Sequence, residues 1–263
     1  MTQQHLNNQA IVVTGASSGI GAATARVLAA RGSHVLLLAR QADRLATLVA
    51  DIQASGGRAT AFPVDLADPQ AIVATAQAIT AAWGAPDALI NNAGAGRWKG
   101  ILDTTATEAA EMMAVPYLAA FNLTRELLPG MLARGAGHIV NVTSVAARLS
   151  WPGAVGYATA RHAMEGFTNA LRADLAGTGL RVSLAIFGTV ESDYWRNNPG
   201  SRERLPAAAQ RTRALRPDEA ARHLVTLLER PRRTLIEPQI FRGLFLLNTL
   251  FPENAEASMR QSG

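Results

Sequence analysis

The stretch Thr14-Gly15-Ala16-Ser17-Ser18-Gly19-Ile20-Gly21 follows an apolar run at 10–14 and leads into an amphipathic segment at 19–31. The first glycine permits a tight turn, and the second lets the backbone approach a pyrophosphate at a helix N-terminus. The third glycine lets the helix pack closely on the strand. This arrangement predicts a dinucleotide-binding loop whose cofactor contacts are Gly15, Ser17, Ser18, Gly19, Ile20 and Gly21.

Short apolar runs alternate with longer helical stretches along the whole chain, which is typical of βαβ units and a parallel sheet. We expect strands at 10–14, 34–39, 59–64, 88–91, 138–142, 182–187 and 234–237, and helices at 19–31, 42–55, 68–83, 106–133, 156–177 and 217–230. The predicted fold class is therefore α/β, with a Rossmann-type, doubly wound, seven-stranded parallel sheet flanked by helices. No linker, repeat or low-complexity segment divides residues 1–263, so we expect one dinucleotide-binding domain.

Arg40 directly follows the second expected strand. A carboxylate at this place would bond the ribose 2′-hydroxyl of NAD, whereas an arginine accommodates the 2′-phosphate of NADP. Arg40 therefore predicts NADP(H), with Ser17 as a second phosphate contact. The alternative is a solvated loop arginine.

Composition narrows the class of protein. The 263 residues are 48% hydrophobic and 17% charged, which excludes an intrinsically disordered or fibrous chain. The absence of cysteine excludes a disulfide framework and a thiolate metal site, and we expect no metal. We find neither a secretory leader nor an apolar run long enough to span a membrane, so we expect a cytoplasmic protein without a membrane span.

The formal net charge of +5 is concentrated in one segment. Residues 196–216 hold six arginines and one acid, Glu203, which leaves the remainder neutral. A nucleic-acid-binding protein usually spreads its basic residues over a surface, so we expect no nucleic acid partner. Two interpretations stay open: a solvated basic loop, which we favour, and capture of an anionic substrate or an acidic carrier protein.

Several motifs occur in the order of a known family. Residues 14–21 read TGASSGIG, residues 91–94 read NNAG, and Asp65 follows the third expected strand. Ser144 precedes Tyr157 by thirteen positions. In these motifs, and over nearly its whole length, the chain resembles the short-chain dehydrogenase/reductase (SDR) family.

This resemblance implies hydride transfer between a nicotinamide cofactor and the carbon of a small carbonyl or alcohol substrate. It implies that Tyr157 is the general acid/base and that Ser144 hydrogen-bonds the substrate oxygen. Besides the glycine loop and Arg40, the cofactor contacts that it implies are Asp65, Asn91, Ala93, Gly94, Tyr157, Arg161, Gly188, Thr189 and Val190.

The resemblance also concerns the C-terminal part of the chain. Residues 188–216 correspond to the variable substrate loop of the family. The apolar segment at about 239–252 fits a helix packed over the substrate cleft or against a neighbouring subunit. Family members are commonly dimers or tetramers, so we expect a homodimer or homotetramer and prefer subunit packing to attachment to a membrane surface.

Two positions depart from the family pattern. A free tyrosine has a pKa of about 10, so Tyr157 needs a nearby cation to favour the phenolate. The family has a lysine four residues later, where this chain has Arg161, and an asparagine of a proton relay where the alignment places Pro116. Arginine supplies charge but cannot pass on a proton. Proline is also expected to kink the helix over 106–133, because it frees the carbonyl of Met112.

These departures leave a second function open. The leading hypothesis is an NADP(H)-dependent oxidoreductase with an atypical Tyr-x-x-x-Arg site. The alternative is a divergent SDR that binds nucleotide with weak or no redox activity, in a non-redox or regulatory role.

Overall fold

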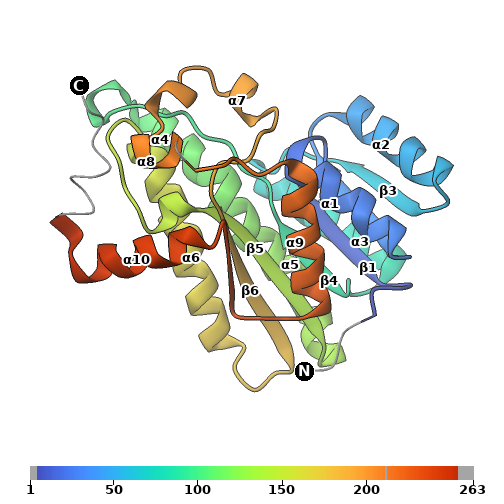
Figure 1. The fold of residues 1–263 in the computed structure, drawn as a ribbon. Coiled ribbons are helices and arrows are strands. Elements are labelled where there is room, and N and C mark those ends of the chain that lie inside the picture. Colours follow the sequence, from blue (N-terminus) through green and yellow to red (C-terminus); the bar gives the residue numbers. More distant parts are fainter. Residues whose placement is uncertain (1–4, 211, 254–263) are drawn as a thin grey trace.

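The computed structural model describes residues 5–210 and 212–253, and within them one parallel sheet runs through the centre of the molecule (Figure 1). Its strands are β1 (Ala10–Thr14), β2 (His34–Ala39), β3 (Arg58–Pro63), β4 (Ala88–Asn91), β5 (Gly137–Ser144), β6 (Leu180–Phe187) and β7 (Thr234–Glu237). Their order across the sheet is β3-β2-β1-β4-β5-β6-β7, and the neighbouring strands are parallel. The predicted doubly wound, Rossmann-type sheet is confirmed.

Helices cover both faces of the sheet (Figure 1). One face carries α1 (Gly19–Ala30), α2 (Ala42–Ala54) and α9 (Pro217–Glu229), and the other carries α3 (Pro69–Trp83), α5 (Ala119–Arg134) and α6 (Val155–Asp174). Successive strand residues point to opposite faces, so Ile11 and Val13 pack with one layer and Val12 with the other. Coverage on both faces explains why the strands are almost continuously apolar.

The helix that was predicted to kink at Pro116 contains a wide helical turn there. The stretch expected over 106–133 consists of α4 (Ala106–Met113), a π-helical segment (Ala114–Leu118) and α5. Pro116 is buried in the middle of the π-helical segment. Proline cannot donate to a carbonyl four residues earlier and its ring crowds that carbonyl, so the chain takes the wider turn there.

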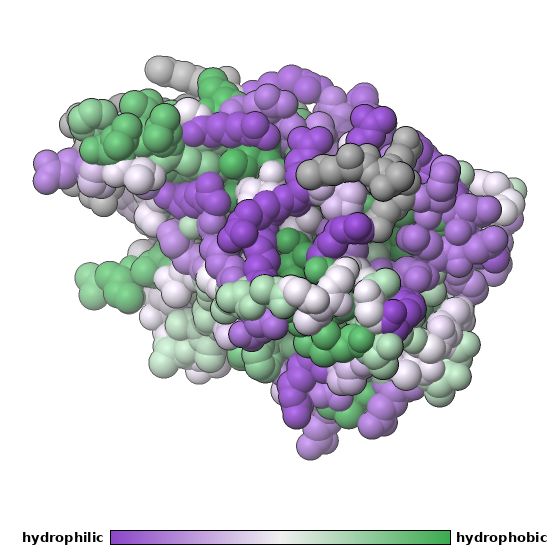
Figure 2. Space-filling view, turned by 90° about the horizontal axis from the view of Figure 1, so that it is seen from below, coloured by the Kyte–Doolittle hydropathy of each residue, from purple (hydrophilic) through white to green (hydrophobic). Residues whose placement is uncertain are grey.

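The loop between β6 and α9 carries two short helices, α7 (Tyr194–Asn197) and α8 (Ala207–Gln210). After β7, the apolar C-terminal segment forms α10 (Ile240–Leu250), which buries Phe241 and Phe245. Figure 2 shows apolar surface at the left, the side on which α4 and α10 lie in Figure 1. In the described ranges, no helix has the length and apolarity that crossing a membrane requires.

The loops after β1 and β4 meet where the strand order reverses. The Thr14 hydroxyl accepts the backbone N–H groups of Asn92 and Ala93, both at 2.9 Å, and donates to the carbonyl of Ile90 at 3.3 Å. A Cβ on Gly15 would lie 2.9 Å from the Cα of Ala93. Thr14 and Gly15 therefore hold the two loops in contact, and ligands of such sheets bind at this point.

Replacing Thr14 tests this link. Thr14→Val keeps the side-chain shape but leaves the N–H groups of Asn92 and Ala93 without their acceptor, so the free energy of unfolding should fall by about 1–3 kcal/mol. Thr14→Ser keeps the oxygen and should lose clearly less. Urea unfolding of the three proteins measures the difference, and an equal loss in both variants would show that the hydroxyl is not what joins the loops.

Candidate functional site

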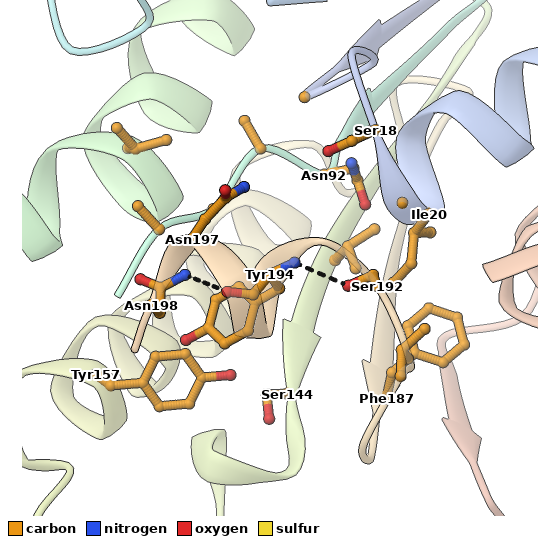
Figure 3. Close-up of a pocket in the computed structure, with 18 of the residues that line it drawn as sticks. Ser18, Ile20, Asn92, Ser144, Tyr157, Phe187, Ser192, Tyr194, Asn197 and Asn198 are labelled. Carbon is orange, nitrogen blue, oxygen red and sulfur yellow. Dashed lines mark hydrogen bonds between the residues drawn. The ribbon is translucent and has the colours of Figure 1, made fainter. Parts of the chain in front are cut away.

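An open cavity of about 380 Å³ lies beyond the carboxyl ends of the central strands (Figure 3). It runs from the loop after β2 to the start of α6. The predicted site residues that line it are Gly15, Ser17, Ser18, Gly19, Ile20, Arg40, Asp65, Ala93, Gly94, Ser144, Tyr157, Arg161, Gly188, Thr189 and Val190. The structure thus brings residues from most of the chain into one site.

The glycine loop forms the wall nearest to α1. Gly15 and Gly19 have φ of 67° and 54°, a conformation that glycine adopts most readily. Ser18 is the N-cap of α1, yet its side chain makes no capping hydrogen bond in the described structure, which leaves the first-turn N–H groups open to an anion. Gly21 is not among the described lining residues. A Cβ there would lie 2.2 Å from the Gly15 carbonyl oxygen, so Gly21 serves the packing of helix on strand.

The end of the cavity near β2 and β3 combines one cation with one anion. Arg40 is exposed, and no ion pair involving it occurs in residues 5–210 and 212–253. Asp65 accepts the N–H of Ala67 at 3.0 Å, while Val64 and Leu66 are buried and apolar. This end of the cavity thus combines an apolar surface with an exposed guanidinium group.

Ser144 ends β5, and Tyr157 and Arg161 lie one turn apart on the same face of α6. Tyr157 is 7% exposed, and its hydroxyl points toward the side of the cavity on which Ser144 lies (Figure 3). The Ser144 oxygen accepts the N–H of Ala146 at 3.3 Å, which leaves its own hydrogen available for donation. Two hydroxyl groups therefore face one part of the cavity.

Arg161 is a buried cation at the centre of the site. It is 7% exposed, its Cζ lies 5.0 Å from the centre of the Tyr157 ring, and its Nη2 would lie 2.6 Å from a Cβ on Gly94. Its Nε has no hydrogen-bond partner, and no described carboxylate forms an ion pair with it. Burying a charge without a counter-charge costs free energy, which is typical of a group kept for a ligand.

Asn91 is not one of the described residues that line the cavity, and it lies behind the cavity wall. Its amide donates to Asn141 at 2.8 Å and to Thr124 at 3.2 Å, and Asn141 donates to Thr168 at 2.9 Å. This buried network ties β4 and β5 to α5 and α6. Its neighbour Asn92 is the residue of the pair that lines the cavity.

Backbone contacts hold both ends of the 188–216 loop. Gly188 donates to the carbonyl of Glu237 at 2.8 Å, and a Cβ on Gly188 would lie 2.8 Å from the Phe241 ring. Val190 forms a parallel bridge with Leu215. The start of the loop is therefore tied to the end of β7, and its end is tied back to its start. Helix α10 packs behind Gly188, and none of the described α10 residues lines the cavity.

Carboxylates from just outside the basic segment neutralise most of its described arginines. The ion pairs are Arg196–Asp193 at 3.0 Å, Arg202–Glu191 at 2.7 Å, Arg213–Glu219 at 2.6 Å and Arg216–Asp218 at 3.3 Å. Arg204 lies against Gly153, and Arg211 lies outside the described residues. Over 191–219 the sequence holds six arginines and five acids. No described arginine of this segment lines the cavity, so the geometry favours a solvated loop over capture of an anion.

Sequence reasoning missed the aromatic residues of the site. Trp98, Trp151, Tyr194 and Trp195 line the cavity together with Tyr157. Trp98 donates its indole N–H to the Tyr194 hydroxyl at 2.9 Å. Burial, and to a smaller extent the neighbouring Tyr157, raises the pKa of Tyr194, so this hydroxyl stays protonated. The sequence signal that could have identified these four aromatic residues is their position after the expected strands, where ligands of such sheets bind.

Comparison with known proteins agrees with this geometry. A family model described as short chain dehydrogenase matches residues 9–202. The chain belongs to the short-chain dehydrogenase family. This SDR chain is 35% identical over 195 residues to Dehydrogenase/reductase SDR family member 7B of Bos taurus, covering 72% of this chain and 60% of that protein. It thus spans about 60% of the length of that curated relative.

Solved SDR structures share the fold over most of their length. An SDR from Burkholderia phymatum in complex with NAD has a TM-score of 0.86 and 26% identity, covering 96% of this chain and 97% of that one. A metagenomic short-chain oxidoreductase in complex with NADP has a TM-score of 0.73 and 32% identity, covering 86% and 92%. SDR proteins of this fold therefore bind either cofactor.

The residues present fit a nicotinamide dinucleotide. The glycine loop offers a helix N-terminus without a side-chain cap. The end of the cavity beside β2 and β3 holds Arg40, and the end beside β5 and α6 holds Ser144, Tyr157 and Arg161. These features lie along one continuous cavity, in the order that an extended dinucleotide requires.

Proposed function

We propose that this SDR is an NADP(H)-dependent oxidoreductase that interconverts a carbonyl and an alcohol. The observation that supports the proposal is the convergence of Ser144, Tyr157 and Arg161 with the glycine loop in one cavity. The cofactor, when bound, supplies or accepts a hydride. The protein supplies proton transfer, charge and orientation.

Each catalytic side chain has one task in this proposal. Ser144 donates a hydrogen bond to the substrate oxygen and fixes its position. Tyr157 gives a proton to that oxygen in reduction and takes it back in oxidation. Arg161, close to the Tyr157 ring, supplies positive charge and bonds ribose hydroxyl groups. Because a guanidinium does not release its proton near neutral pH, Arg161 stabilises charge without relaying protons.

Arg40 supports NADP(H) as the cofactor. It is exposed on the cavity wall directly after β2, and Ser17 lines the same cavity. A planar guanidinium suits a 2′-phosphate, which a carboxylate in its place would repel. The NADP complex of the metagenomic relative agrees with this choice, and the NAD complex of the Burkholderia phymatum protein makes it worth testing.

Cofactor selection can be measured directly. Arg40→Asp should weaken NADPH binding by about 10- to 100-fold, as expected for loss of a charge-assisted contact of about 1.5–3 kcal/mol, and should change NADH binding little. Arg26→Asp makes the same change in net charge at a distant exposed ion pair and serves as the control. Dissociation constants from calorimetry decide, and an equal loss for both cofactors would show that Arg40 does not contact the phosphate.

The second candidate function is nucleotide binding without redox chemistry. Two observations favour it: Pro116 stands at the relay asparagine, and Arg161 at the lysine. With these two residues the site keeps a positive charge beside Tyr157 but lacks the family's groups that relay protons. Turnover of NADPH with a panel of ketones and aldehydes separates the two candidates.

We expect measurable turnover that Tyr157→Phe lowers by at least about 100-fold, since removal of a general acid/base typically costs that much. Arg161→Lys alone should not restore typical activity, because Pro116 lacks the relay amide. Arg161→Lys combined with Pro116→Asn should raise kcat above that of Arg161→Lys. Tight NADPH binding with no turnover of any compound would favour the second candidate.

We also propose that the protein is a cytoplasmic homodimer or homotetramer. The outer side of α10 exposes Leu246 and Leu250, which are 60% and 59% accessible, and Ile240 is 63% accessible. Apolar patches of this kind mark sites of protein association. Light scattering should give the mass of two or four chains, and Leu246→Asp with Leu250→Asp should lower it. A monomer at all concentrations would contradict the proposal.

A further inference from the structure

Five tryptophan and tyrosine side chains line the cavity beside the catalytic hydroxyl groups. The sequence has four Trp and three Tyr, and five of these seven residues line this cavity. They come from three separate loops or their borders: Trp98 after β4, Trp151 and Tyr157 after β5, and Tyr194 and Trp195 after β6. Only 5% of the residues in this chain are aromatic, so five rings lining one cavity are a marked concentration. We call these five side chains the aromatic wall.

Trp98 is the centre of this wall. Its ring centre lies 5.0 Å from that of Tyr157, 5.2 Å from Trp151 and 5.8 Å from Trp195. Tyr194 continues the wall, at 6.3 Å from Tyr157 and 5.3 Å from Trp195. These separations are typical of tilted and edge-to-face aromatic pairs, the arrangement that an additional ring can join.

The protein itself uses the indole N–H groups of two of these rings, whereas the buried N–H of Trp151 has no partner in the described structure. The indole N–H of Trp98 donates to Tyr194, and that of Trp195 donates to the carbonyl of Val190 at 3.0 Å. Both N–H groups are therefore committed to internal partners. What these two side chains offer to a ligand is ring surface, which favours an apolar or aromatic group over a polar one.

Charge around the wall opposes a charged ligand. The guanidinium groups of Arg161 and Arg202 already lie over Tyr157 and Trp195, at 5.0 and 5.9 Å. A cationic ligand would meet the positive charge of Arg161, which no described carboxylate pairs, and Asp65 is the one carboxylate among the described lining residues, at the far end after β3. Arg202 is paired with Glu191, so it offers little to an anion. The proposed function assigns the charge of Arg161 to the cofactor ribose, so an anionic ligand finds no free cation at the wall and a neutral ligand is favoured.

We infer that the substrate is an uncharged ketone or aldehyde that carries an aromatic ring, with Trp98, Trp151 and Trp195 as specificity-determining residues. The inference rests on the proposed redox function, because the wall adjoins Ser144 and Tyr157. It adds that the ring of the substrate packs against the wall while its carbonyl meets the two hydroxyl groups.

A matched pair of ketones tests the inference. 4-Phenylbutan-2-one and 4-cyclohexylbutan-2-one have the same carbonyl environment and differ in the ring. We expect kcat/KM with NADPH to be about 3- to 10-fold higher for the phenyl compound, the range given by one additional aromatic pair. Two further compounds replace the ring by a trimethylammonium or a carboxylate group, and we expect both to be poorer substrates than the phenyl compound.

Trp195 allows a matched pair of variants. Trp195→Phe and Trp195→Leu both lose the N–H that bonds Val190, but Trp195→Phe keeps an aromatic ring. The preference for the phenyl compound should persist in Trp195→Phe and fall toward one in Trp195→Leu. Equal ratios in the two variants would remove Trp195 from the specificity determinants.

Calorimetric binding of the corresponding alcohols, in the presence of NADP⁺, separates failure of this inference from failure of the proposed function. A phenyl preference in binding without turnover would contradict the redox function and support the aromatic site. Equal affinity for the phenyl and cyclohexyl alcohols, or turnover that is best with the trimethylammonium or carboxylate compound, would overturn the inference.

Discussion

The close approach of the loops after β1 and β4 is the constraint on which the site depends. A side chain at Gly15 would collide with Ala93, one at Gly94 with Arg161 and one at Gly96 with Tyr157, at 2.9, 2.6 and 2.6 Å. The segment after β4 is thus wedged between the glycine loop and α6. Because protein interiors transmit small displacements, this wedge couples the position of the cofactor loop to that of the catalytic side chains.

The same wedge explains how an arginine fits at position 161. The guanidinium lies against Gly94, where any larger residue would have to displace it, and over the Tyr157 ring. The Thr143 hydroxyl donates to the Arg161 carbonyl at 3.2 Å and so ties α6 to β5. The site keeps a buried positive charge next to the tyrosine, but with a planar head group. In the proposed function, charge stabilisation and proton relay, which one lysine combines, are therefore separate, and the π-helical turn at Pro116 carries no relay amide.

The fold, and the glycine-loop residues that line the cavity, were predictable because their signals are local. Apolar runs defined the strands, and the bounds of β1, β2, β4 and β7 agree with the prediction. The conformation of the glycine loop could be predicted because glycine is the residue type that most readily adopts positive φ. The role of Asn91 was harder to see, because NNAG does not show which of two adjacent amides points into the cavity. Burial decides it: Asn91 is 2% exposed and bonds Asn141.

The chemistry of the substrate side could not be read from sequence because it depends on pairing over distance. A count over 196–216 finds a basic segment, but the acids that neutralise it stand at 191, 193, 218 and 219, just beyond either end. In the same way Trp98, Trp151 and Trp195 are about fifty positions apart and form a wall only when three loops meet. Because those charges are paired, they contribute little long-range attraction for a ligand, and in the proposed function contact with ring surfaces is the main source of selectivity.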